Sequence, residues 1–222
     1  MERGTTGDLP GRTCAALLDV GVRFALVVAG EDRWRRDPGC VFVPVELPGG
    51  VFPPDTTPEV ALAALGERWF GRPLRLVSAR ATYGPSAAHA IDRLPPHDPP
   101  APLILLERMA PGNPERGGGV RRVTVALYHA TPDRGEDEDE DAAIAPYGPC
   151  AGLLLLSWQA LRQVVRGLPL ADLLARDDVS LQPRPGVVLP AETLIYLTGE
   201  YGERLLLRVA AKYGAQALGK DM

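Results

Sequence analysis

The sequence predicts an α/β (α+β) protein with a mixed or mostly antiparallel sheet, helices on its faces and a helical C-terminal end. Three observations lead to this prediction. Several short apolar runs rich in Val, Leu and Ile are separated by Gly and Pro. One segment, 57–70, carries both a helix start and a helix stop. The tail, 190–213, places apolar side chains at helical spacing.

Composition is that of one globular domain with many turns. The chain has 222 residues, 45% of them apolar, with 24 Gly and 23 Pro. The net charge is −4, and the acidic run 136–141 alone supplies six negative charges. The rest of the chain is therefore near neutral, so charge gives no reason to expect nucleic-acid binding.

Nothing in the sequence indicates secretion or a membrane. The three cysteines are scattered and form no CxxC pair, which fits a reducing compartment. The first residues have no apolar core of a signal peptide, and no run reaches the roughly 18 apolar residues of a membrane span. We expect a cytoplasmic protein that does not associate with membranes.

The chain divides into a flexible lead-in (1–12), a main domain (13–200) with an acidic loop at about 133–143, and a C-terminal helix (201–222) packed on that domain. The short apolar stretch 13–18 precedes the first predicted strand. Two strands separated by a Gly/Pro loop form a long predicted hairpin, 103–109 with 120–129. The expected strands are 21–29, 40–47, 74–83, 103–109, 120–129 and 152–156.

The first predicted helix has the clearest boundaries. Thr57 is a suitable N-cap, Pro58 suits the first turn, and Gly71 followed by Pro73 ends the helix near Phe70. Ser157 caps a second helix that reaches about Arg166. A short helix is expected at 170–176. The tail, 190–213, is expected to hold two helices separated near Gly199 and Gly202.

One segment resembles the Nudix box of the Nudix hydrolase family. It contains Leu47-Pro48-Gly49-Gly50, then Thr57-Pro58-Glu59, then Gly71. Gly50 and Gly71 are 21 positions apart, as are the first and last glycines of that box. Residues 153–161 are similar to the family's last strand and second helix, and the resemblance covers roughly 20–200. It implies a Nudix-like mixed sheet sandwiched between helices.

The same resemblance shows what this chain lacks. The family holds divalent metal ions on glutamates of one helical face, and the ions activate water against a diphosphate. By spacing, the family's box has glutamates at the positions that correspond to 56, 65, 68 and 69, and an arginine at the position that corresponds to 64. This chain has Thr56, Ala64, Leu65, Arg68 and Trp69 there. The box is therefore degenerate, with no metal ligand among these positions.

Two other glutamates of this segment are weak catalytic candidates. Glu67 lies roughly 160° around the helix from the mean direction of positions 65, 68 and 69. Glu59 belongs to the first turn, where a negative charge suits the helix dipole. Neither replaces the missing ligands, and we assign no catalytic residue with certainty.

If the pocket of the family persists, its ligand-binding candidates here are Arg68, Gly49, Gly50 and Trp69. Arg68 would contact an anion directly, because a guanidinium pairs well with phosphate; a solvated helix residue is the simpler interpretation. Leu62, Leu65 and Trp69 form an apolar stripe. That stripe is expected to be core or interface rather than a surface for stacking bases.

Other residues that could carry chemistry have simpler explanations. His89, His97 and His129 lack metal-ligand spacing, and Gly117-Gly118-Gly119 lacks the Lys-Ser/Thr of a P-loop. The cluster 33–36 (Arg-Trp-Arg-Arg) could form a small anion or nucleic-acid patch, but it has no basic background.

Three functions remain open on the sequence. The first is a non-catalytic binding or scaffold protein, with a homodimer or another protein as partner and no cofactor. The second is a divergent hydrolase of nucleoside diphosphate-linked compounds, with Mg²⁺ or Mn²⁺ held by Glu46, Glu59, Glu67 or Glu107. The third is a sensor of a nucleotide or ADP-ribose-like ligand that uses Arg68. The missing box glutamates favour the first function.

Overall fold

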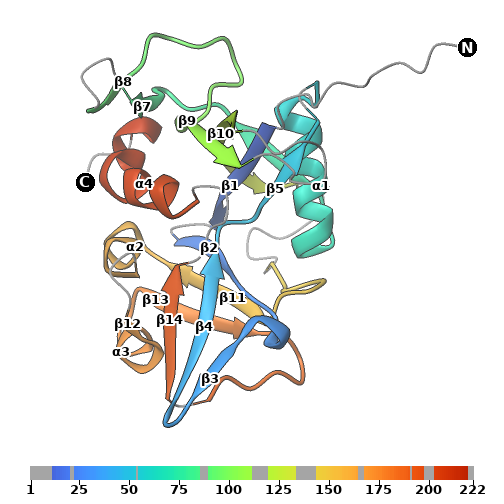
Figure 1. Cartoon of the computed structure of the whole chain (residues 1–222), viewed down its shortest axis with the longest axis vertical. Coiled ribbons are helices and arrows are strands. Elements are labelled where there is room, and N and C mark those ends of the chain that lie inside the picture. Colours follow the sequence, from blue (N-terminus) through green and yellow to red (C-terminus); the bar gives the residue numbers. More distant parts are fainter. Residues whose placement is uncertain are drawn as a thin grey trace, which may run out of the picture.

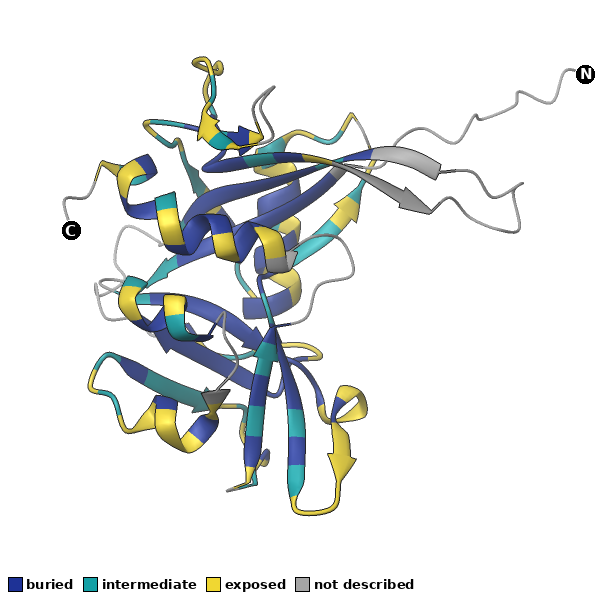
Figure 2. Ribbon diagram, turned by 60° about the vertical axis from the view of Figure 1, so that its left-hand side comes forward, coloured by how far each residue is buried: buried dark blue, intermediate teal, exposed yellow. Residues whose placement is uncertain are grey.

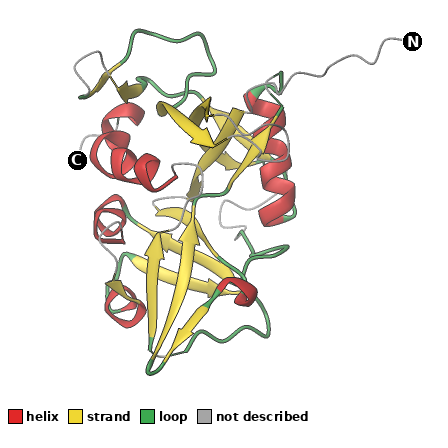
Figure 3. Cartoon of the chain, viewed as in Figure 1, coloured by secondary structure: helices red, strands yellow, loops and turns green. Residues whose placement is uncertain are grey.

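The computed structural model describes residues 12–20, 23–53, 55–85, 90–111, 120–133, 144–164, 168–190, 192–197 and 203–219. These residues form a mixed α/β fold with one large mixed sheet and four α-helices, the last of them at the C-terminal end. Figure 3 shows the strands in the middle and the helices outside them. The predicted fold class is confirmed.

The helices are α1 (Pro58–Phe70), α2 (Trp158–Val164), α3 (Leu170–Leu174) and α4 (Glu203–Leu218), with a short 3-10 turn, η1 (Glu31–Arg33). The strands are β1 (Arg12–Val20), β2 (Arg23–Val28), β3 (Arg35–Asp37), β4 (Cys40–Glu46), β5 (Gly49–Phe52), β6 (Leu74–Val77), β7 (Tyr83–Pro85), β8 (Ile91–Arg93), β9 (Ile104–Pro111), β10 (Val120–Pro132), β11 (Gly152–Leu156), β12 (Leu168–Pro169), β13 (Val179–Pro183) and β14 (Thr193–Leu197).

Strands β1, β2 and β10 form the middle of the sheet (Figure 1). β1 runs parallel to β10 on one side and antiparallel to β5 and then β2 on the other. β10 pairs with β9 and then with β6, both antiparallel. β2 continues the sheet to β4 and β11. The segment that resembles a Nudix box, β5 through α1 to β6, thus connects strands on either side of the β1–β10 pair.

The sheet has helices on both faces, and the side-chain alternation of β1 shows why. Cys14, Ala16 and Leu18 belong to one buried cluster, which also contains the apolar side of α1. Ala15 and Leu17 belong to the other cluster, which contains apolar residues of α2, α3 and α4. Figure 2 shows these central strands almost entirely buried. The predicted arrangement of a sheet between helices is therefore confirmed.

Most predicted elements are present in the structure. The predicted hairpin is the antiparallel pair β9–β10. The predicted strands 21–29, 40–47 and 152–156 correspond to β2, β4 and β11, and the helices from Thr57 and Ser157 correspond to α1 and α2. The predicted strand 74–83 is shorter than expected. It ends at Val77, and β7 begins at Tyr83.

The prediction of two helices in 190–213 is wrong in its first half. Residues 193–197 form β14, which runs parallel to β4 from Thr193↔Val41 to Leu197↔Val45. Thr193, Ile195 and Leu197 are buried, whereas Leu194 and Tyr196 are half-buried. Only the second half is helical, as α4.

Some sequence predictions lie outside the described residues. These are the acidic run 136–141, the lead-in up to residue 11, His89, the Gly117–Gly119 turn, and Gly199 with Gly202. None of the helices in the described part of the chain combines the length and the apolar character needed to cross a membrane.

Candidate functional site: the first helix and the pocket beside it

Helix α1 begins and ends as its sequence predicts. Thr57 is in an extended conformation, and its side chain accepts a hydrogen bond from the Val60 N–H at 3.4 Å. Pro58 occupies the first helical position. At the other end, Gly71 has φ 66°, a left-handed conformation that favours glycine, and its N–H bonds to the Glu67 carbonyl at 3.2 Å.

The side of α1 that faces the sheet is apolar core. Leu62, Leu65 and Trp69 are 0%, 1% and 6% exposed and pack in one cluster with Cys14, Ala16 and Tyr128. The prediction that this stripe is a core face is confirmed. Two of the positions where the resemblance asks for a metal-binding glutamate, 65 and 69, therefore lie in the interior.

The remaining box positions point elsewhere. Ala64 and Arg68 are exposed, and Thr56 is half-buried. The Arg68 guanidinium carbon lies 5.0 Å from the centre of the Trp69 ring, a distance typical of a cation–π contact. Part of its charge is thus placed over an aromatic side chain of its own helix.

Gly49 and Gly50 lie in β5, opposite Ala15 and Cys14 of β1. A Cβ atom added to Gly50 would lie 3.3 Å from the Phe52 ring and 3.5 Å from a Leu65 methyl carbon. The start of β5 is therefore packed against the buried side of α1. None of the four sequence-predicted ligand residues (Gly49, Gly50, Arg68, Trp69) lines the pocket described next.

A pocket of about 570 Å³ lies between α1 and β6. Its polar and charged lining comes from Glu59 of α1, Arg75 of β6, Ser78 just after β6, and Asp133 just after β10. Its apolar lining consists of Ala63, Pro73, Leu74, Leu76, Pro99 and Pro100. Apart from Glu59, sequence reasoning missed these residues, because they come from four segments that only the fold brings together.

Gly66 is what allows α1 to lie so close to the start of β6. A Cβ added there would be 2.4 Å from the Arg72 carbonyl oxygen and 2.6 Å from the Leu74 nitrogen. Both atoms are backbone and cannot move aside as a side chain would. This close approach holds α1 against Pro73 and Leu74, which both line the pocket.

The four carboxylates proposed as substitute metal ligands do not meet at this pocket. Glu46 pairs with Arg33 at 2.8 Å, and Glu67 and Glu107 are exposed on α1 and β9. Only Glu59 of the four lines the pocket. Among the residues that the structure describes, no group of three or more His, Cys, Asp or Glu is placed to hold a metal ion.

The basic cluster at 33–36 does not form a single surface. Trp34 is buried, and its indole N–H donates to the Ala29 carbonyl at 2.8 Å. Arg33 pairs with Glu46, whereas Arg35 pairs with Asp37 at 3.2 Å and stacks on Phe42. Trp34, Arg33 and Arg35 thus each have contacts within the fold that give them a structural role.

His129 has one hydrogen-bond partner on the neighbouring strand. Its Nε2 lies 3.2 Å from an Asp19 carboxylate oxygen, and both side chains are largely buried. His97 is exposed. Neither histidine belongs to a group of three or more possible metal ligands among the residues that the structure describes.

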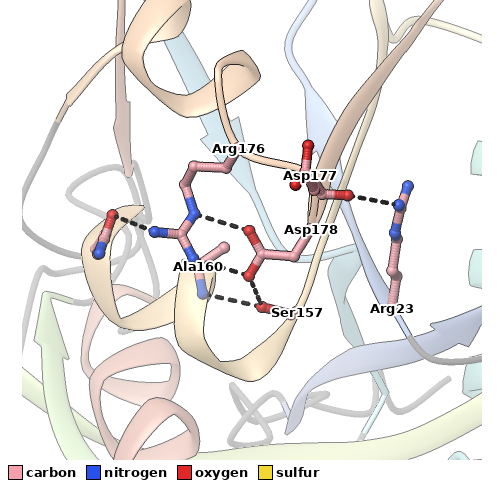
Figure 4. Close-up of polar contacts among 7 residues, drawn as sticks. Arg23, Ser157, Ala160, Arg176, Asp177 and Asp178 are labelled. Atoms are coloured by element: carbon pink, nitrogen blue, oxygen red, sulfur yellow. Dashed lines mark hydrogen bonds and ion pairs between the residues drawn. The ribbon is translucent and has the colours of Figure 1, made fainter.

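A second polar cluster, Ser157, Arg176 and Asp178, lies at the start of α2 (Figure 4). Ser157 caps α2 by accepting from the Ala160 N–H at 3.1 Å, and its hydroxyl donates to Asp178. Arg176 donates to both Asp178 oxygens at 2.8 Å. Arg176, with a smaller contribution from Ser157, holds the pKa of Asp178 below its usual value, despite partial burial.

Every charge in this cluster is satisfied locally, so we assign it a structural role. Arg23 adds a further connection between strands, with bonds to the Ser180 hydroxyl at 2.8 Å and the Asp177 carbonyl at 3.0 Å. The capping of α2 by Ser157 was predictable from sequence. Its bond to Asp178, 21 residues away, was not.

Comparison with known proteins gives a limited result. No protein-family model and no curated protein matches the chain. Among solved structures, a Nudix hydrolase from Nitrosomonas europaea aligns at 8% identity and TM-score 0.38, covering 69% of this chain and 60% of that one. The chain thus spans 60% of the length of that structure.

Two further structures align over more of their length. The E. coli ORF135 protein aligns at 13% identity and TM-score 0.37, with 72% of this chain and 83% of that one covered. An ADP-ribose pyrophosphatase from Streptococcus suis aligns at 12% identity and TM-score 0.37, covering 91% and 92%. At these scores and identities, the comparisons assign neither an activity nor a ligand to this chain.

Proposed function

We propose that the chain is a non-catalytic binding or scaffold protein, built on a Nudix-like layout without the metal-binding glutamates. The observation that carries this proposal is the burial of Leu65 and Trp69, which are 1% and 6% exposed in the core between α1 and the sheet. In this chain, the helical face that would hold metal in the family contributes to folding instead.

The chemistry of the box positions supports the same proposal. Mg²⁺ and Mn²⁺ require oxygen ligands, usually carboxylates. Positions 56, 64, 65, 68 and 69 offer one hydroxyl, three apolar side chains and one guanidinium. A guanidinium repels a divalent cation. These residues do not fit the metal ions that the resemblance implies.

The pocket between α1 and β6 is the binding site that this proposal favours. It combines a volume suited to a small ligand or a few residues of a peptide with two carboxylates and one guanidinium. No element of this site requires a nucleotide, and Arg68 is not among its lining residues. The geometry therefore favours binding at this pocket over a nucleotide sensor that uses Arg68.

A product assay tests the proposal against the hydrolase alternative. Purified protein, shown by circular dichroism to be folded, is incubated with Mg²⁺ or Mn²⁺ and a panel of nucleoside diphosphate-linked compounds, and products are separated by chromatography. We expect no product above a protein-free control. Turnover that a chelator abolishes, and that Glu59→Gln or Glu67→Gln also abolishes, would overturn the proposal.

A further inference from the structure

Strand β6 lies at an edge of the sheet, and the pocket lies along that edge. Among the described strands, β6 pairs only with β10, from Leu74↔Pro132 to Val77↔His129. Leu74, Arg75 and Leu76 all line the pocket. Consecutive side chains of a strand point to opposite faces of the sheet. The side chains of Leu74 and Leu76 lie on one face and that of Arg75 lies on the other. Because the pocket is lined by all three residues, it must lie along the edge of β6.

The hydrogen-bond pattern shows which backbone groups face this edge. The Asp133 N–H bonds to the Pro73 carbonyl at 3.0 Å, so 73 and 133 form a hydrogen-bonded pair. Such pairs alternate in an antiparallel ladder, which makes 75↔131 and 77↔129 the next bonded pairs. The N–H and C=O groups of Leu74 and Leu76 consequently point away from β10.

Helix α1 covers only part of this edge. The Leu74 nitrogen lies beside Gly66, where even a single added Cβ would come within 2.6 Å of it. The Leu74 carbonyl and both backbone groups of Leu76 lie farther along the strand, at the pocket. Within the described chain, no backbone hydrogen bond to these three groups is formed outside the ladder. They are the groups that an added strand would need.

The walls of the pocket and its charges indicate what can enter. Glu59 and Ala63 of α1 border one side, and Pro99 and Pro100 border another, so the edge is recessed. A second copy of this chain would present an equally recessed β6, and two recessed edges cannot meet. The pocket holds two carboxylates, Glu59 and Asp133, against one guanidinium, Arg75. An entering chain is therefore favoured if it carries basic side chains.

We propose that the β6 edge binds an extended segment of another protein that carries basic residues, by strand addition within this pocket. The backbone of the segment bonds to the Leu74 carbonyl and to both backbone groups of Leu76, and its basic side chains lie near Glu59 and Asp133. This inference rests on the proposed function, because it names the class of partner that the non-catalytic site takes.

Fluorescence anisotropy with a labelled probe, the heptapeptide Lys-Thr-Val-Thr-Val-Thr-Lys, tests strand addition. Two further peptides of the same sequence carry N-methyl groups on alternate residues, one in each register. N-methylation removes the N–H donors on one edge of an extended peptide without changing its charge. We expect one of the two registers to bind at least about tenfold more weakly than the unmodified peptide, because two backbone bonds are lost. Equal binding of all three peptides would overturn the proposal.

Variants of the protein test the same contact from the other side. Leu76→Pro removes the outward N–H without removing a bond to β10, and Leu76→Ala is its control because it shortens the side chain and keeps the N–H. We expect weak binding for Leu76→Pro and nearly intact binding for Leu76→Ala. Equal affinities, from protein shown to be folded, would contradict strand addition.

Charge reversal tests the preference for basic residues. Glu59→Lys is expected to weaken binding of the lysine-ended peptide several-fold and to strengthen binding of a glutamate-ended one. Glu67→Lys makes the same change on the same helix outside the pocket and is expected to do neither. Equal effects of both variants would overturn the placement of the site.

A dimer in sedimentation that Leu76→Pro dissociates would instead identify a second copy of the chain as the occupant of the pocket. These readouts are independent of the product assay, so either proposal can fail alone.

Discussion

Asp178 connects the turn before β13 to the start of α2 through its hydrogen bonds. Its carboxylate receives two bonds from Arg176 and one from Ser157, and Ser157 also caps α2 (Figure 4). The sequence predicted the cap, because a serine before an apolar helical run is a local signal. It could not predict the partner, because the turn that carries Asp178 is brought to α2 by the pairing of β11 with β13.

Replacing Asp178 should change how stability depends on pH. The folded pKa of Asp178 lies below its ordinary value of 3.8, chiefly because of Arg176. The stabilisation it provides is therefore fully present above about pH 5 and is lost as the pH falls through the folded pKa. We expect Asp178→Asn to lower the free energy of unfolding at pH 7 by roughly 1 kcal/mol or less. The variant should therefore unfold at a lower urea concentration.

The difference in free energy of unfolding between Asp178→Asn and the unmodified protein should shrink as the pH is lowered from 5 towards 2. Urea unfolding followed by circular dichroism at several pH values measures it. Asp172→Asn, which removes an exposed carboxylate of α3, controls for the change in net charge. A constant difference across this pH range would show that Asp178 contributes through its packing and not through its charge.

At the scale of elements, α1 was predictable in both its limits and its apolar face. Its cap, its terminal glycine and its stripe of Leu62, Leu65 and Trp69 are all local signals. The same local reasoning failed for β14. Leu194 and Leu197 are three apart, as in a helix, but Thr193, Ile195 and Leu197 alternate as in a strand. A run of five residues fits both periods, and pairing with β4 decides between them.

Placing a glutamate at a buried position of α1 should therefore damage the fold and not create a metal site. We expect Leu65→Glu to lower the free energy of unfolding by about 3 kcal/mol or more, because it places an unpaired carboxylate in the core. Arg68→Glu, on the exposed side of the same helix, should change it by about 0.5 kcal/mol or less. Urea titrations compare the two variants. Leu65→Glu protein with unchanged stability and a new affinity for Mn²⁺ would contradict the structural assignment of this face.

For the whole molecule, the sequence predicted the layers and the β9–β10 hairpin, but not the pairings between strands far apart in the chain. The parallel contact of β1 with β10 joins residues more than 100 positions apart, and no local signal specifies it. The pocket depends on such pairings. It exists because β10 ends its ladder with β9 and takes β6 as its next partner, which leaves the far edge of β6 beside α1. A search for motifs along the chain could not have located it.

The proposed function requires that the segment resembling a Nudix box holds no divalent metal ion, and metal binding can be measured directly. Free Mn²⁺ gives an electron paramagnetic resonance signal that largely disappears when a protein binds the ion. Titration of the full chain with Mn²⁺ up to millimolar concentrations should give the same signal as buffer alone. A saturable loss of signal at one or more ions per chain, removed by Glu59→Gln, would instead establish a relocated metal site.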